Sequence, residues 1–176
     1  MTKRQFYEWQ TAGGAAEVLL LVEALEKRAV PWCMIGGLAV NHWAGEPMAT
    51  ADVDLVVARE RIEDAVEALE AAGFKAERFE WSINLRGRSE LRVRISTEDF
   101  YQDFPERSAP ADVHGILMRV ASLEDTLRGK VKAWRDAQRR ASKRQKDLAD
   151  ILRLLEAHPE LRKALPADVA ARLEKA

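Results

Sequence analysis

Residues 35–57, IGGLAVNHWAGEPMATADVDLVV, contain the most informative local pattern of the chain. The apolar run WCMI ends in two glycines, which predicts a buried strand that enters a tight turn. LAVNHWAG then has the composition of a short helix, and the β-branched run over 52–58 predicts a second strand. The stretch therefore predicts a strand, a glycine turn, a helix and another strand in close succession.

Two features of this stretch point to phosphate and metal chemistry. Gly36 and Gly37 lie at a strand-to-helix turn, where glycine lets the backbone approach a ligand and the helix N-terminus offers free N–H groups to a phosphate. Asp52 and Asp54 are two positions apart in a strand, so both carboxylates project from one face, roughly 6.6 Å apart. Such a pair can hold Mg²⁺ or Mn²⁺, and that cation can bind the phosphates of a nucleotide.

The flanking sequence extends this pattern to an α+β fold. Apolar residues at helical spacing predict helices over 15–28 and 59–72. From residue 74 the period falls to two, so 75–81 and 90–96 are expected to form an antiparallel pair around the turn-like INLRGRS. The remaining expectations are a loop over 97–115, a strand over 116–120, a helical region that begins with 121–134, a helix over 142–157 and a short one after Pro166.

Length and composition indicate a small globular protein. The 176 residues suit one core with an appendage, and 47% hydrophobic and 32% charged residues exclude a disordered, collagen-like or fibrous chain. The longest apolar run, 18–22, is too short for a membrane span and the first residues lack a signal-peptide pattern, so we expect a cytoplasmic protein with no membrane partner. One cysteine and three dispersed histidines predict neither an internal disulfide nor a zinc site.

The net charge of −1 conceals an uneven distribution of charge. Residues 1–120 hold 14 Lys and Arg against 20 Asp and Glu, whereas residues 121–176 hold 14 against nine. The basic surplus is concentrated between Arg128 and Lys146, where Asp136 is the only acid. Such a run is compatible with binding of polyphosphate or nucleic acid, and also with a solvated helix face. The shift near residue 121 is the one indication of a domain boundary.

The glycine turn followed by DVD on the next strand resembles the signature of the DNA polymerase β-like nucleotidyltransferase superfamily. The run RQKDLAD over 144–150, preceded by Gly129-Lys130, is similar to the last motif of the abortive-infection type IV toxin nucleotidyltransferases, approximately RxKDxxD. Together these motifs span about residues 34–155. The resemblance implies an α+β fold, with a mixed-sheet nucleotidyltransferase-like lobe over 1–120 and a helical C-terminal lobe over 121–176.

The resemblance also implies roles for individual residues. Asp52 and Asp54 would be the catalytic carboxylates and the ligands of Mg²⁺ or Mn²⁺. The residues that would bind the nucleotide are Gly36, Gly37, Lys130, Arg144, Lys146 and Asp147. The last motif has an ordinary explanation too, because Lys143 with Asp147 and Lys146 with Asp150 have i,i+4 surface-pair spacing, although in the less favourable order.

One departure from the superfamily pattern bears on catalysis. Active members usually carry a third carboxylate in a segment like RIDVS, and here the segment is LRVRIS, with Arg94 at the position of the acid. A guanidinium there would compete for Asp52 or Asp54 instead of binding a metal ion. With the register shifted by two, Glu90 or Glu98 would take the place of the acid. Weaker candidates are Asp99 and Asp103.

These patterns support two main hypotheses. The first is a nucleotidyltransferase that binds Mg-NTP and transfers a nucleotide to an RNA, such as a tRNA, or to a protein or other acceptor, as a toxin-like component with an antitoxin partner. The second, argued from Arg94, is a catalytically degenerate member that binds a nucleotide, an RNA or a protein partner. A purely structural domain is a third, weaker reading. Trp43, Trp81 and Trp134 are expected to pack against apolar neighbours, with base stacking as the alternative.

Overall fold

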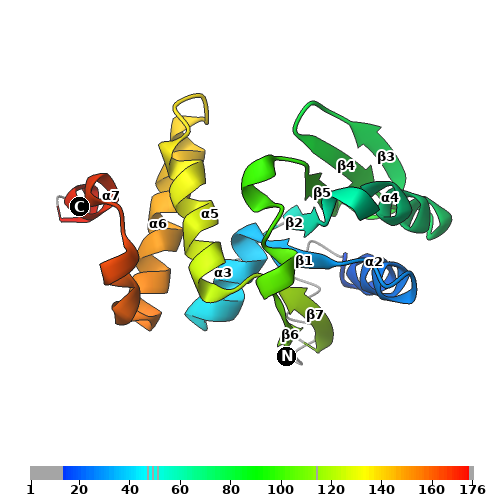
Figure 1. Cartoon of the computed structure of the whole chain (residues 1–176), viewed down its shortest axis with the longest axis horizontal. Coiled ribbons are helices and arrows are strands. Elements are labelled where there is room, and N and C mark those ends of the chain that lie inside the picture. The colour runs from blue at the N-terminus through cyan, green and yellow to red at the C-terminus, as the bar shows by residue number, and fades with distance from the viewer. Residues whose placement is uncertain (1–13, 47, 49, 51, 114, 175–176) are drawn as a thin grey trace.

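The computed structural model describes residues 14–46, 48, 50, 52–113 and 115–174. Helices and strands alternate through the first half, and the last third is helical (Figure 1). In chain order the elements are α2 (Ala15–Lys27), β1 (Trp32–Ile35), α3 (Gly36–Ala44), β2 (Asp52–Val57), η1 (Arg59–Arg61), α4 (Ile62–Ala71), β3 (Lys75–Arg78), β4 (Ser82–Arg86), β5 (Arg92–Ser96), η2 (Asp99–Tyr101), η3 (Pro105–Arg107), β6 (Ala109–Val113), β7 (Ile116–Val120), α5 (Leu123–Arg135), α6 (Ala141–Ala157), η4 (Pro159–Ala164) and α7 (Ala167–Leu173).

Within the described residues, seven strands form one mixed sheet in the order β3-β4-β5-β2-β1-β7-β6. β2 runs parallel to β5, and β1 runs parallel to β7, while the other neighbours are antiparallel. β1 and β2, which carry the glycine turn and the DVD motif, therefore lie in the interior of the sheet. The expected α+β fold with a mixed sheet is confirmed.

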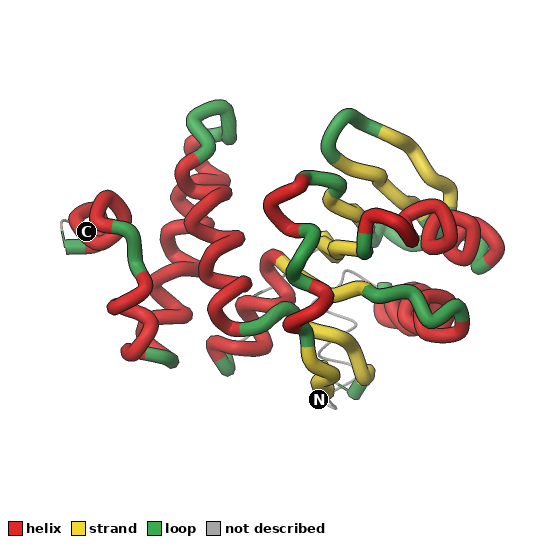
Figure 2. The backbone as a smooth tube through the Cα atoms, viewed as in Figure 1, coloured by secondary structure: helices red, strands yellow, loops and turns green. Residues whose placement is uncertain are grey.

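The two faces of the sheet pack against different elements. Trp32 and Met34 of β1 belong to the main apolar core, which α2 and α4 cover. Cys33 and Ile35 point to the opposite face, where they pack with Tyr101 and other residues of the η2–η3 segment. This alternation is the period-two geometry of a strand that is buried on both faces. Figures 1 and 2 show α5, α6 and α7 on the side of the sheet away from α2 and α4.

The helical last third has its own apolar cluster. Leu127 and Val131 of α5 pack with Ile151 and Leu154 of α6, and Val40 of α3 joins them. α3 therefore contacts both the sheet and the helical part, because Leu38 and Ala39 of the same helix belong to the main core. The division of the chain at residue 120 stays a prediction. Within the described ranges, every helix falls short of the length and apolar character that a membrane crossing requires.

Two expectations for the middle of the chain are wrong in detail. INLR is not a turn, because Ser82–Arg86 forms β4, which lies between β3 and β5 and pairs with both, so the strands expected over 75–81 and 90–96 do not pair with each other. Ile83 and Leu85 are buried while their neighbours are half-buried or exposed, so the period-two pattern continues through this segment. The stretch expected as a loop also contains β6, an edge strand in which Pro110 is tolerated because one side of an edge strand needs no backbone donor.

Candidate functional site

The glycine turn between β1 and α3 is shaped around Asp54. Gly36 has φ +71°, a left-handed conformation that side chains other than glycine rarely adopt. A Cβ atom built at Gly36 would lie 2.6 Å from Asp54 Oδ2, so a larger residue would collide with the carboxylate. The first residues of α3 thus approach the carboxylate of β2 closely, with their helix N-terminus beside it.

Asp52 and Asp54 lie beside two arginines of the parallel strand β5. The register places Asp52 next to Arg92 and Asp54 next to Arg94. Arg94 Nε donates a hydrogen bond to Asp54 Oδ1 at 3.0 Å, and its Nη2 lies 2.9 Å from the same oxygen. Arg92 Nε lies 2.9 Å from Asp52 Oδ1. The Asp54 carboxylate raises the pKa of the Arg94 guanidinium further above its usual value, so this guanidinium stays protonated.

A cleft of about 240 Å³ opens between this part of the sheet and α5. Its sheet wall includes Gly36, Asp54, Arg94 and Ser96, and its helical wall includes residues of α5 and α6. Tyr101 lines the cleft as well, and burial raises the pKa of its phenol, which stays protonated. The helical wall is formed by Asp125, Thr126, Gly129, Lys130, Lys132, Ala133, Asp136, Arg139 and Asp147.

Lys130 is at the centre of a buried ionic network between α5 and α6. Its Nζ lies 3.1 Å from Asp147 Oδ1 and 2.7 Å from Asp150 Oδ2. Both carboxylates are 2% exposed, and each also contacts an arginine: Arg139 Nε is 2.6 Å from Asp147, and Arg153 Nη1 is 3.0 Å from Asp150. A buried charge needs a partner of opposite sign, and in this network each carboxylate lies between two cationic side chains.

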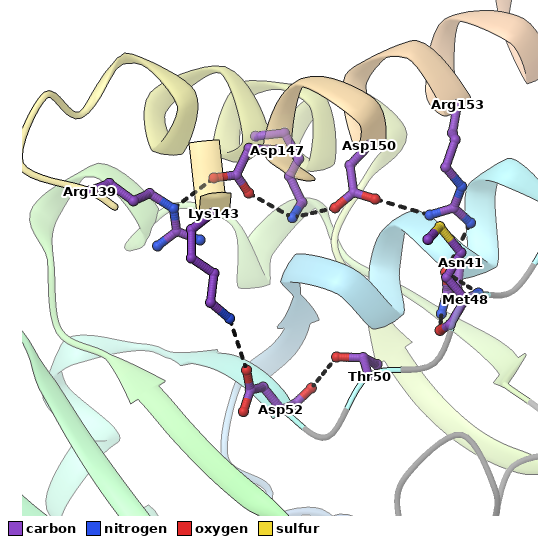
Figure 3. Close-up of polar contacts among 10 residues, drawn as sticks. Asn41, Met48, Thr50, Asp52, Arg139, Lys143, Asp147, Asp150 and Arg153 are labelled. Atoms are coloured by element: carbon purple, nitrogen blue, oxygen red, sulfur yellow. Dashed lines mark hydrogen bonds and ion pairs between the residues drawn. The ribbon is translucent and has the colours of Figure 1, made fainter. Parts of the chain in front are cut away.

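The network continues to the loop that precedes β2 (Figure 3). Arg153 Nη2 donates to Asn41 Oδ1 at 3.0 Å and also contacts the Glu46 carbonyl oxygen. Asn41 in turn accepts a hydrogen bond from the Met48 backbone N–H at 3.0 Å and donates to the Met48 carbonyl oxygen at 2.7 Å. The chain of contacts therefore connects α6 through α3 to the segment that leads into Asp52.

A second hollow, which we call the furrow, lies beside the cleft and shares Asp54, Arg94 and Arg139 with it. Its volume is also about 240 Å³. Figure 3 shows Lys143 extending from α6 toward Asp52, and its Nζ lies 4.0 Å from Asp52 Oδ2. The furrow is lined by Asp52, Asp54, Asn84, Leu85, Arg86, Arg92, Val93, Arg94, Arg139 and Lys143.

The structure brings most of the predicted site residues together. Four of them, from four different elements, line the cleft: Gly36, Asp54, Lys130 and Asp147. Asp52 lines the adjacent furrow, and Gly37 follows Gly36 in the first turn of α3.

Arg144 and Lys146 are placed differently and line neither hollow. Arg144 Nε donates to the Trp134 carbonyl oxygen at 2.8 Å, and its guanidinium lies over the Trp134 ring. Lys146 is exposed on α6.

The candidates for a third carboxylate have other partners. Glu98 lines the cleft but pairs with Lys132, Asp99 pairs with Arg59, and Asp103 lies 2.9 Å from Arg107. Glu90 is exposed in the loop before β5. Asp125 of the helical wall is also neutralised, since it accepts hydrogen bonds from Arg107 and Arg128.

The donor set does not fit the divalent metal site that this fold usually carries. Among the residues that the structure describes, no group of three or more His, Cys, Asp or Glu side chains could hold a metal ion. One oxygen of each carboxylate of the DVD motif contacts a guanidinium, and Arg94 stands at the sequence position where the resembled superfamily has a third acid.

Sequence reasoning missed two contributors to the cleft. Trp81 is 58% exposed and lines the cleft, so the expectation that it packs against apolar neighbours is wrong, and base stacking, the alternative, stays a prediction. Trp43 and Trp134 do pack against the helical cluster. The position of Trp81 in the β3–β4 turn explains the exposure, because a turn lies outside the alternation of the strands. Arg139 was visible within the basic run, but its contact with Asp147 depends on the bend between α5 and α6.

The mixed sheet carries a strand, a glycine turn, a helix and an acidic strand, and it faces a helical wall with a buried lysine. This arrangement is the nucleotidyltransferase fold of the DNA polymerase β-like type. The chain belongs to the nucleotidyl transferase AbiEii toxin family of type IV toxin–antitoxin systems, whose model matches residues 19–176. No curated protein sequence matches the chain.

Solved structures with the same fold include antibiotic-modifying enzymes. The antibiotic-resistance factor ANT(2'')-Ia is 16% identical with a TM-score of 0.61, over 94% of this chain and 93% of that chain. The lincosamide antibiotic adenylyltransferase LnuA is 15% identical with a TM-score of 0.56, over 79% of this chain and 96% of that chain. JHP933 from Helicobacter pylori is 18% identical with a TM-score of 0.59, over 94% of this chain and 73% of that chain. At these identities the likeness is one of fold.

Proposed function

We propose that this chain is a nucleotide-binding member of its family, in which arginines have replaced the metal-centred transfer site. The observation that carries the proposal is the Arg94–Asp54 pair, with both contacts to Asp54 Oδ1 at 3.0 Å or less. The same strand places Arg92 on Asp52, so one oxygen of each carboxylate of the motif has a guanidinium partner.

Nucleotide binding is supported by the features that the cleft retains. The N-terminus of α3 and the left-handed Gly36 form a turn of the kind that binds phosphate. Lys130 and Arg139 supply positive charge on the opposite wall, and the cleft and the furrow adjoin one another. Trp81 offers an exposed aromatic face at the same cleft for a base to stack on.

A second candidate function is transfer of a nucleotide from Mg-NTP to an RNA, such as a tRNA, or to a protein acceptor. Family membership favours it, and so does the gathering of Gly36, Asp54, Lys130 and Asp147 around one cleft. In either case the family description makes an antitoxin the partner to look for. The cytoplasm remains the location that we propose.

Two parallel measurements separate these candidates. The purified chain is titrated with ATP, GTP, CTP and UTP in Mg²⁺, and label transfer from each α-³²P nucleotide is followed onto total RNA and onto the protein itself. We expect binding of at least one nucleotide and no labelled acceptor. A labelled acceptor that disappears in Asp52→Asn/Asp54→Asn would establish transfer instead, and failure to bind any nucleotide would refute the proposal.

A variant tests whether Arg94 is the residue that separates binding from transfer. Arg94→Asp replaces the guanidinium with a carboxylate beside Asp54, which restores three acids on adjacent strands. If Arg94 alone blocks catalysis, this variant transfers label in Mg²⁺ while the wild type does not. Continued inactivity would show that the remainder of the cleft has diverged as well.

A further inference from the structure

The face of the sheet in the furrow presents arginine rather than carboxylate to a ligand. Two rows cross the three strands β4, β5 and β2: Arg86, Arg92 and Asp52 in one row, and Asn84, Arg94 and Asp54 in the next. The side chains of Arg92 and Arg94 are 66% and 51% exposed, whereas those of Asp52 and Asp54 are 39% and 18% exposed. An anion that approaches this surface therefore meets a guanidinium before it meets a carboxylate.

These guanidiniums retain donors for such an anion. A guanidinium carries five N–H donors in a planar fork, and the pair with Asp54 engages only Nε and Nη2 of Arg94. The carboxylate below also fixes the guanidinium plane, so little side-chain freedom remains to be lost when a second anion binds. Phosphate oxygens match the geometry of this fork and form short, charge-assisted hydrogen bonds with it.

The opposite wall of the furrow adds charge of the same sign. Arg139 and Lys143 reach it from the α5–α6 side, where Lys143 Nζ lies 4.0 Å from Asp52 Oδ2. Together with Arg86, Arg92 and Arg94 they make five cations against two carboxylates in the lining of the furrow, and Asp147 behind the lining pairs with Arg139, which leaves an excess of two positive charges. A divalent cation between Asp52 and Asp54 would stand next to two guanidiniums, and the mutual repulsion would oppose its binding. An anion would relieve the same excess of positive charge.

We infer that Arg92 and Arg94 hold the polyphosphate of a nucleoside triphosphate directly, without a divalent cation. This inference rests on the proposed nucleotide binding and specifies how it occurs. The guanidiniums neutralise the phosphate charge that a metal ion neutralises in metal-dependent members of the fold. The base would then lie in the cleft toward Trp81, and the α3 turn beside Asp54 would bind the phosphate nearest the sugar.

The test is nucleotide binding with and without divalent cations. Wild-type chain is titrated with each of ATP, GTP, CTP and UTP in EDTA and again in Mg²⁺, by calorimetry at low ionic strength. We expect dissociation constants that agree within threefold between the two conditions. Arg94→Gln should weaken binding in EDTA at least tenfold, and Arg94→Lys should weaken it less because it keeps the charge. Arg172→Gln, which alters an exposed arginine of α7, is the matched control and should leave binding unchanged.

Competition identifies the part of the ligand that the arginines bind. Inorganic tripolyphosphate should displace the bound nucleotide, whereas AMP should displace it poorly. If a single-stranded RNA oligonucleotide displaces it and tripolyphosphate does not, the furrow binds a phosphodiester backbone instead and the inference is overturned. Thermal melts of all variants establish that they are folded.

The possible failures are distinct. Binding that appears only in Mg²⁺, and is lost in EDTA, would show that the carboxylates hold a metal ion after displacing the arginines, and it would overturn this inference alone. An Arg94→Gln variant that binds as tightly as the wild type in EDTA would overturn it too. Absence of nucleotide binding in both conditions would overturn the proposed function from which it starts.

Discussion

Lys130→Met removes the ammonium group that lies between two buried carboxylates. Asp147 and Asp150 are each 2% exposed and lie 3.1 Å and 2.7 Å from Lys130 Nζ. Methionine preserves the length and the apolar stem of the side chain, so the substitution isolates the loss of charge. Two carboxylates then remain in the interface between α5 and α6 with less compensation.

The size of the effect follows from this geometry. Breaking a buried ion pair by removing one partner costs about 3–5 kcal/mol. Each carboxylate here keeps one arginine, Arg139 on Asp147 and Arg153 on Asp150, so we expect the lower end, about 3 kcal/mol. For a chain of this length that corresponds to a fall in Tm of roughly 6–12 °C. The variant should still fold, because typical stabilities are about 5–15 kcal/mol.

Thermal and urea unfolding followed by circular dichroism measure this loss. Lys146→Met is the matched control, because Lys146 is next to Asp147 in the sequence but exposed, and its substitution should change stability by less than about 0.5 kcal/mol. A Lys130→Met variant whose Tm stays within about 2 °C of the wild type would refute the reasoning, since the network would then carry no net stabilisation. Equal losses in both variants would refute it as well.

Three further predictions concern separate parts of the molecule. Gly36→Ala should lower the free energy of unfolding by at least about 1–2 kcal/mol, because it forces a left-handed alanine against Asp54. Gly37→Ala should cost less in the same urea titration, because its Cβ would lie 3.4 Å from the nearest side-chain atom, Thr50 Oγ1. Burial alone would raise the pKa of Glu17, but hydrogen bonds from the β4–β5 loop lower this pKa below 4.5. The stability that the wild type gains over Glu17→Gln should therefore be present at pH 7 and shrink as the pH falls through the lowered pKa. A difference in Tm between the two proteins that does not change with pH would contradict this prediction. Cys33 is fully buried and its thiol pKa is raised by desolvation, so a disulfide reagent should modify it far more slowly in the native chain than in urea; equal rates would argue against its burial.

The sequence predicted the fold well where the apolar residues keep one helical or strand spacing without interruption. Helices 15–28 and 142–157 and the strand over 52–58 match the structure to within a few residues, because each carries a continuous apolar face. β4 was missed because Asn84, Arg86 and the following glycine resemble a turn, although Ile83 and Leu85 keep the strand period. Only the pairing with β3 and β5 shows that the segment is a central member of its half of the sheet.

The site was predictable in composition but not in contacts. The family pattern placed Arg94 at the position of the missing acid. Its pairing with Asp54, which lies 40 residues earlier in the sequence, depends on the parallel register of β2 and β5. For Asp147 the sequence offered Lys143 as an i,i+4 partner, whereas the structure pairs it with Lys130 and Arg139. Contacts between separate helices follow from packing, which local spacing does not specify.

The two outer strands of the sheet determine how this protein behaves when it is concentrated. β3 is the outer strand at one end and carries Lys75, Glu77 and Arg78, and β6 at the other end contains Pro110. Charges and proline at these positions disfavour the addition of a foreign strand, which is the usual route to sheet-mediated aggregation. Self-association by extension of the sheet is therefore disfavoured at both of these edges.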